Sequence, residues 1–103
     1  MKRYRVIIED AAGEDILDHA AWIASEGSPI NAQRWMNGIE DAIQSLTHMP
    51  SRFPVAPESK SFGIAIRHFV FKSHRVLYHI DGSTVRVLHI RHAARRRWKP
   101  PMN

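Results

Sequence analysis

Residues 64–89, I-A-I-R-H-F-V-F-K-S-H-R-V-L-Y-H-I-D-G-S-T-V-R-V-L-H, decide the fold of this chain. Their apolar and polar side chains largely alternate, and β-branched and aromatic residues are common, which is typical of strands. The pattern predicts strands at Ile64–Phe71, Arg75–Ile80 and Val85–His89 or beyond, with Lys72-Ser73-His74 between the first two. Asp81-Gly82 is a hairpin turn signal between the last two, and we expect a loop of more than two residues there.

The sequence before this stretch predicts one more strand, at Arg3–Ile8, and two helices. Asp10 is expected to cap the first helix and Gly27 to end it. Ser28-Pro29 begins the second helix, with serine as the cap and proline in the first turn, and Met49-Pro50 ends it. Apolar residues recur at helical spacing in both helices: Ile16, Leu17, Ala20, Ile23 and Ala24 in the first, and Trp35, Ile39, Ala42, Ile43 and Leu46 in the second. We expect Trp22 and Trp35 to pack within this helical hairpin.

Residues 50–63 contain three prolines and read as a loop or extended connection. The sequence therefore predicts an α+β fold of order β-α-α-β-β-β. In it, a largely antiparallel, twisted sheet carries the αα-hairpin on one face. A length of 103 residues is typical of a single domain, and we expect residues 1–103 to form one.

Positive charge is concentrated in the last 40 residues. Residues 64–103 contain nine Lys/Arg and one acid, 9 − 1 = +8, whereas residues 1–63 contain six bases and nine acids, 6 − 9 = −3. This asymmetry indicates an anionic or acidic partner. The nine bases are Arg67, Lys72, Arg75, Arg86, Arg91, Arg95, Arg96, Arg97 and Lys99.

The chain contains no cysteine, which excludes disulfides, a cysteine nucleophile and thiolate metal sites, and is consistent with a cytoplasmic protein. No apolar run is long enough to span a bilayer, so we expect no membrane association. There is no glycine-rich phosphate loop and no metal-binding histidine motif, so we expect neither a cofactor nor a metal site.

Strand alternation assigns each side chain to one face of the sheet. Val76, Tyr78 and Ile80 should oppose Arg75, Leu77 and His79 in one strand. In the strand before it, Arg67, Phe69 and Phe71 should oppose Ile66, His68 and Val70. In the last strand, Arg86, Leu88, Ile90 and His92 should oppose Val85, Val87, His89 and Arg91. Because the helices cover one face only, the other exposes apolar and basic groups together, which is typical either of a binding surface or of an ordinary half-exposed sheet.

The tail H-I-R-H-A-A-R-R-R-W-K-P-P is the densest cationic stretch. It suits phosphate binding, where arginine is bidentate, but a solvated terminus has the same composition. Trp98 either stacks on a base or, as we expect, anchors the tail on the core. Among seven histidines, His92 is the best candidate for proton transfer, since it lies beside Arg91, Arg95 and Arg96.

The ordered segments Y-R-V-I-I-E-D-A-A-G-E-D-I, L-T-H-M-P, G-I-A-I-R-H-F, H-R-V-L-Y-H-I and V-R-V-L-H-I-R-H-A-A-R resemble the RelE/ParE superfamily of type II toxin–antitoxin systems. The resemblance covers roughly residues 4–97 and is closest to the ParE, or plasmid stabilisation, branch. It implies a bacterial toxin neutralised by an antitoxin whose acidic, amphipathic C-terminal segment wraps around it, so that a toxin–antitoxin hetero-oligomer is expected.

The resemblance implies two alternative activities. RelE-type members cut mRNA in the ribosome, and their strand arginine matches Arg75, while the arginine after the last strand matches Arg95, or Arg96 in a shifted register. The lysines of that group match Ile66 and His68, and its C-terminal tyrosine falls near Pro101. ParE-type members poison DNA gyrase and lack the nuclease residues, which favours this branch. Arg67 matches an arginine common to the branch, expected to be structural or to face the antitoxin.

We therefore expect a non-enzymatic toxin that inhibits an essential target, DNA gyrase, by binding. A ribosome-dependent mRNA endoribonuclease, a degenerate non-toxic member and a generic nucleic-acid-binding domain are the alternatives. If the chain is a ribonuclease, Arg75, Arg95 and His92 are the candidate catalytic residues. The residues expected to bind the antitoxin or the target are Arg67, Arg75, Arg86, Arg91, Arg95, Arg96, Arg97 and Trp98.

Overall fold

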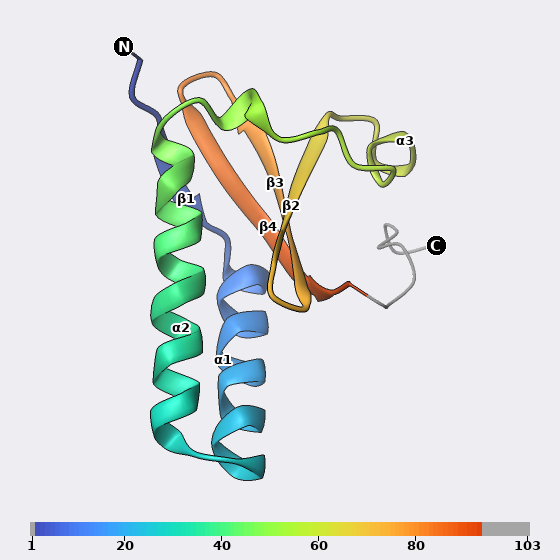
Figure 1. Ribbon diagram of the computed structural model, residues 1–103. Coiled ribbons are helices and arrows are strands. Elements are labelled where there is room, and N and C mark those ends of the chain that lie inside the picture. Colours follow the sequence, from blue (N-terminus) through green and yellow to red (C-terminus); the bar gives the residue numbers. More distant parts are fainter. Residues whose placement is uncertain (1, 94–103) are drawn as a thin grey trace.

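The computed structural model describes residues 2–93 and contains two long helices and a four-stranded sheet (Figure 1). The α+β order β-α-α-β-β-β predicted from the sequence is confirmed, with short helical turns added between α2 and β2. The elements are β1 (Arg5–Ile8), α1 (Asp10–Glu26), α2 (Pro29–Gln44), the 3-10 turns η1 (Ser45–Thr47) and η2 (Pro50–Arg52), α3 (Ser59–Phe62), β2 (Ile66–Phe71), β3 (His74–Asp81) and β4 (Thr84–His92).

The sheet has the strand order β1-β4-β3-β2. β2 pairs with β3 and β3 with β4 in antiparallel fashion, whereas β1 runs parallel to β4. Two-residue turns join the antiparallel strands: Lys72-Ser73 with φ of 53° at Lys72, and Gly82-Ser83 with φ of 60° at Gly82. The expectation of a longer loop after Asp81 was wrong, because glycine adopts the left-handed conformation that a tight hairpin turn requires at little cost.

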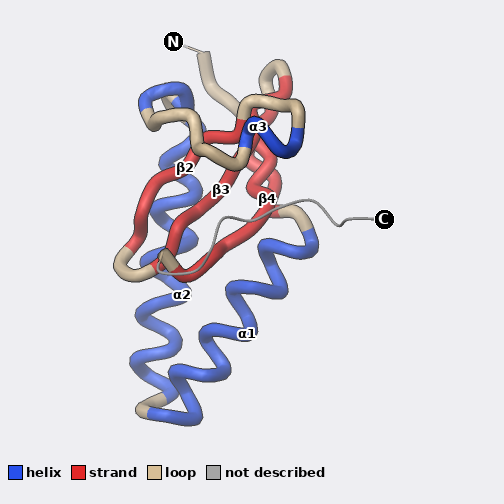
Figure 2. The backbone as a smooth tube through the Cα atoms, turned by 90° about the vertical axis from the view of Figure 1, so that its right-hand side faces the viewer, coloured by secondary structure: helices blue, strands red, loops and turns tan. Residues whose placement is uncertain are grey.

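The helices form a hairpin on one face of the sheet (Figures 1 and 2). The predicted cap of α2 is confirmed, since the Ser28 hydroxyl accepts hydrogen bonds from the backbone N–H groups of Ile30 and Asn31 at 3.1 and 3.2 Å. Gly27 follows the last residue of α1, as predicted. The remaining two boundaries differ: Glu9 rather than Asp10 precedes the first turn of α1, and α2 ends at Gln44, where a 3-10 turn follows.

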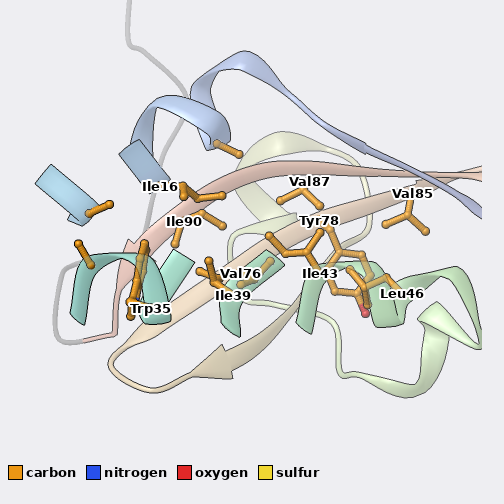
Figure 3. Close-up of a cluster of buried hydrophobic side chains, with 13 residues drawn as sticks. Ile16, Trp35, Ile39, Ile43, Leu46, Val76, Tyr78, Val85, Val87 and Ile90 are labelled. Atoms are coloured by element: carbon orange, nitrogen blue, oxygen red, sulfur yellow. The ribbon is translucent and has the colours of Figure 1, made fainter. Parts of the chain in front are cut away.

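The main core lies between the helical hairpin and the sheet (Figure 3). The apolar stripes predicted from helical spacing supply most of its helical half, except that Leu17, which is 60% exposed, and Ala42 are not among its members. Trp22 is 56% exposed, so the separate expectation that it packs within the hairpin was wrong. The fully or nearly fully buried members shown in Figure 3 include Ile16, Trp35, Ile39, Ile43, Leu46, Val76, Tyr78, Val85, Val87 and Ile90.

A β-bulge in β4 changes which side chains share a face. Leu77 pairs with His89 but the next residue, Tyr78, pairs with Val87, so Leu88 is an extra residue in β4. The predicted alternation is therefore correct in β2, in β3 and in β4 as far as Leu88, but wrong from His89 onward. Ile90 packs in the main core together with Val85 and Val87, whereas strict alternation had placed it on the opposite face.

Residues 50–63 do more than connect α2 to β2. The segment carries α3 across the face of the sheet that lies opposite the hairpin (Figure 1). There Ala56, Ile66 and Leu77 form a second buried cluster, flanked by Phe62 and Leu88. The face that the sequence left uncovered is therefore covered in part by this segment. No helix within residues 2–93 is both long and apolar enough to cross a bilayer.

Candidate binding face of the sheet

Beyond the second cluster, strand pairing places four polar side chains and one apolar side chain on the face of the sheet opposite the helices. His68 and His89 flank Leu77, and Val70 and Arg91 flank Arg75. Val70 is 60% exposed, and the other four side chains are partly buried. We call His68, Val70, Arg75, His89 and Arg91 the open face. It combines basic and apolar groups, as the sequence predicted for the side of the sheet away from the helices.

Arg75 is held on the open face by a buried ion pair. Its Nη1 and Nη2 donate to the two carboxylate oxygens of Glu58 at 2.7 and 2.8 Å. The Glu58 side chain is 0% exposed and that of Arg75 is 12% exposed, so both charges are removed from water. A bidentate pair of this kind satisfies a buried carboxylate and fixes the guanidinium. Arg75 therefore also ties the segment before α3 to the sheet.

His68 continues this network. Its Nδ1 accepts hydrogen bonds from Nε and Nη2 of Arg75 at 3.1 and 2.9 Å. Because a guanidinium can only donate, Nδ1 carries a lone pair here and the ring proton is on Nε2. Burial, and then the charge of Arg75, lower the pKa of His68 below 6.5, against a smaller opposing effect of Glu58. His68 is thus a neutral hydrogen-bond donor at neutral pH.

Arg91 lies directly opposite Arg75 in the β3–β4 pairing. Its Nε is buried and has no hydrogen-bond partner among residues 2–93. Like charges opposite each other in a sheet repel, and within residues 2–93 the carboxylate of Glu58 is ion-paired with Arg75 and not with Arg91. This part of the open face consequently has an excess positive charge and one donor that an incoming acceptor would satisfy.

His89 connects the open face to α1. Its Nδ1 lies 2.8 Å from Oδ2 of Asp15, and the same oxygen accepts from the backbone N–H of Ile90 at 2.9 Å. Asp15 thereby accepts a hydrogen bond from a backbone N–H group at the edge of β4, beyond the part of that strand that pairs with β1.

The other predicted site residues are dispersed. Arg67 lies on the helix side and donates to the carbonyl groups of Phe53 and Ser51 at 2.6 and 3.2 Å, which holds the connecting segment in place. Arg86 lies near the start of β4, paired with Glu9 at 2.9 Å and Asp81 at 3.6 Å.

His92 contacts the ring of His74 with centroids 5.3 Å apart. Since His74 pairs with Phe71, which packs on the helix-side core, His92 and Arg75 lie on opposite faces of the sheet. Of the three residues proposed for ribonuclease chemistry, these two are therefore not brought together. Arg95, Arg96, Arg97 and Trp98 lie outside the described residues.

Two partners of the open face were missed from the sequence. Glu58 stands alone in a proline-rich stretch and contacts a strand residue far along the chain, so no local spacing identifies it. Asp15 looks like any acid in the first half of a helix. Within residues 2–93, no group of three or more His, Asp or Glu side chains is placed to hold a metal ion.

Comparison with known proteins identifies relatives. Residues 6–97 match the family model described as the ParE toxin of type II toxin–antitoxin systems, parDE. The chromosomal ParDE TA system from P. aeruginosa contains a chain that is 11% identical, with a TM-score of 0.72 over 87% of this chain and 96% of that chain.

The toxin–antitoxin complex RelBE2 from Mycobacterium tuberculosis contains a chain that is 24% identical. Its TM-score is 0.56, over 92% of this chain and 97% of that chain. At these identities the likeness establishes the fold alone. No curated protein sequence matches the chain.

Proposed function

Since this chain belongs to the family of ParE toxins of type II toxin–antitoxin systems, we propose that it acts in the cytoplasm by binding DNA gyrase and is neutralised by an antitoxin that docks on the open face. The docking segment is acidic and amphipathic and lies at the C-terminal end of the antitoxin. The two proteins then form a hetero-oligomer.

The observation that carries the docking proposal is the unsatisfied Nε of Arg91 beside a second guanidinium, next to exposed Val70. A carboxylate from the partner supplies the missing acceptor and offsets the excess charge. An apolar side chain on the same segment covers Val70. Acidic and apolar groups are thus required together, and an amphipathic segment provides both.

The same geometry supports binding over ribonuclease chemistry. General acid–base catalysis needs two proton-transfer groups within reach of one reacting centre. Arg75 is engaged by Glu58, and Nδ1 of His68 is occupied by Arg75. His92 lies across the sheet from both.

The docking surface is tested with the protein encoded next to this one as the titrant, using calorimetry. Arg91→Gln should weaken binding about tenfold or more, because it removes one partner of a desolvated charge pair. Arg34→Gln, on the exposed face of α2, makes the same change in charge and should leave the affinity unchanged. Equal affinities of the two variants would place the antitoxin elsewhere.

The target is tested with purified gyrase and, in parallel, with ribosomes translating a defined mRNA. Inhibition of supercoiling that the antitoxin relieves is the expected result. If supercoiling proceeds normally while the mRNA is cut at the ribosomal A site, the chain is a RelE-type ribonuclease instead. Activity in neither assay, with normal growth when the chain is induced alone, would identify a non-toxic member.

A further inference from the structure

A cleft of about 710 Å³ lies on the helix side of the sheet, away from the open face. α1 forms one wall, and the β2–β3 turn and the end of β4 form the other. The residues that matter for its chemistry are Asp18, His19, Trp22, Trp35, Lys72 and His92.

The cleft is built around stacked aromatic rings. His19 stacks on Trp22 with centroids 5.6 Å apart and an interplanar angle of 21°, and it meets the edge of buried Trp35 at 4.6 Å. Trp22 is nevertheless 56% exposed, so more than half of this residue remains accessible to solvent despite the stack. A large aromatic ring held rigidly by a stack on one side offers a flat platform on the other.

The α1 wall of the cleft is negatively charged in a protein of net charge +5. α1 contains five acids and no lysine or arginine. Asp18 precedes Trp22 by four residues, so the two side chains are neighbours on one helix face. Asp15 is engaged by His89 and Ile90, whereas Asp18 makes no hydrogen bond or ion pair with any residue in the range 2–93.

The basic groups Lys72 and His92 belong to the wall opposite α1, so the basic group on the α1 wall is His19, which stacks on Trp22. Lys72 comes from the β2–β3 turn on the opposite wall, where its Nζ lies 5.8 Å from the ring centroid of Phe71. Burial, together with the charge of His92, lowers the pKa of His19 below 6.5. His19 is therefore neutral at neutral pH and does not repel a cation placed on Trp22.

We propose that this cleft is a docking site for an arginine side chain of a partner protein, with the guanidinium stacked on the free face of Trp22 and paired with the carboxylate of Asp18. Arginine fits better than lysine because its planar head stacks on an aromatic ring while its edge donates two hydrogen bonds to one carboxylate. The site goes beyond the proposed function, because its charge is opposite to that of the open face and it lies on the other side of the sheet.

The test is a titration of the full chain with the peptide acetyl-Gly-Arg-Gly-amide at low ionic strength, followed by NMR at the indole N–H of Trp22. The peptide in which citrulline replaces arginine is the matched control, since its ureido group keeps the planar shape and one donor edge but has a carbonyl oxygen in place of one NH2 group and carries no charge. We expect a saturable shift at Trp22, with binding of the citrulline peptide about fivefold weaker or more.

Variants separate the site from a general acidic surface. Asp18→Asn should weaken binding of the arginine peptide to the level of the citrulline peptide. Glu26→Gln, at the far end of α1, changes the charge equally and should have no effect. Trp22→Leu should abolish binding of the arginine peptide. Because Trp22 is more than half exposed, the unfolding temperature of this variant should stay close to that of the parent protein.

Three results would overturn the proposal. The first is equal binding of the arginine and citrulline peptides, or no shift at Trp22 up to the solubility limit of the peptide. The second is an equal effect of Asp18→Asn and Glu26→Gln. The third is concentration-dependent self-association of the protein that Asp18→Asn abolishes, because the occupant would then be a second copy of this chain. None of these outcomes depends on the toxin activity or on the antitoxin.

Discussion

Replacing Arg75 by alanine should destabilise the protein strongly, because it removes the guanidinium that pairs bidentately with the buried carboxylate of Glu58. The side chain of Glu58 is 0% exposed and that of Arg75 is 12% exposed, so the pair is largely shielded from water. Removing one member of a buried pair costs about 3–5 kcal/mol, which is a large part of the roughly 5–15 kcal/mol that stabilises a small domain. Nδ1 of His68 would lose its donors as well.

The assay is urea denaturation at neutral pH, followed by far-UV circular dichroism, on Arg75→Ala and on a double-mutant cycle made of Glu58→Leu, Arg75→Met and the double variant. Arg75→Ala should lower the free energy of unfolding by about 3–5 kcal/mol. The double variant Glu58→Leu/Arg75→Met should recover to within about 1 kcal/mol of the parent protein, because apolar residues of similar volume often replace a buried pair without loss. Arg34→Ala, on the exposed side of α2, should change stability by less than about 0.5 kcal/mol.

A cost below about 1 kcal/mol for Arg75→Ala, with a coupling energy near zero, would refute the argument that this pair fastens the α3 segment to the sheet. The result also decides how loss of toxicity at Arg75 is interpreted. If the pair is as strong as expected, an inactive Arg75→Ala variant is explained by loss of folding and is no evidence of a catalytic role. Arg91 is therefore the better position at which to test the open face by mutation, because it has no ion-pair partner among residues 2–93.

Three further predictions concern packing and burial. Tyr78→Phe should lower stability by about 1–3 kcal/mol in urea titrations, because it leaves the buried carbonyl of Pro50 without its donor. Burial raises the pKa of Tyr78 from 10.0 to about 12, so ultraviolet titration should find this phenol ionising last. Its contribution to stability is complete below pH 10 and is lost as the pH rises towards about 12, and a phenol that titrates normally in the folded protein would contradict this. Gly13→Ala should raise stability by about 0.5–1 kcal/mol, since nothing lies within 4 Å of the added methyl group. Gly38→Ala should lower stability by about 1–3 kcal/mol, since its methyl group would lie 2.7 Å from Cζ of Phe71, and thermal unfolding that ranks the two alanine variants the other way would contradict this.

Local signals predicted the parts of the fold that depend on local chemistry. Ser28-Pro29 marked the start of α2 because a serine cap and a proline in the first turn satisfy a helix terminus from within the same segment. Asp81-Gly82 marked the last hairpin for a similar reason. The ordered segments that resemble the ParE branch also identified the family correctly, since the family model of ParE toxins matches residues 6–97.

The features that sequence reasoning missed depend on tertiary contacts. The bulge at Leu88 could not be recognised in the segment V-R-V-L-H-I. Apolar residues fall on both faces of this strand whether the side chains alternate strictly or shift by one residue, so the pattern does not distinguish the two arrangements. That one residue decides whether Ile90 and His92 face the helices or the open face. The ion pair of Glu58 and Arg75 joins a loop to a strand, and nothing in the spacing of either segment indicates the other.

The parallel pairing of β1 with β4 has a consequence for how the toxin is made. Among residues 2–93, β4 is the last strand in chain order, yet it lies between β1 and β3 in the sheet, with Arg5 beside Thr84. During translation, β1 has no strand to pair with and the helical hairpin cannot complete its core until β4 has been synthesised, since contacts so distant in sequence form only after the intervening chain has been translated. The nascent toxin therefore cannot complete its sheet until β4 has been translated, so that its folded shape arises only after most of these residues have been made.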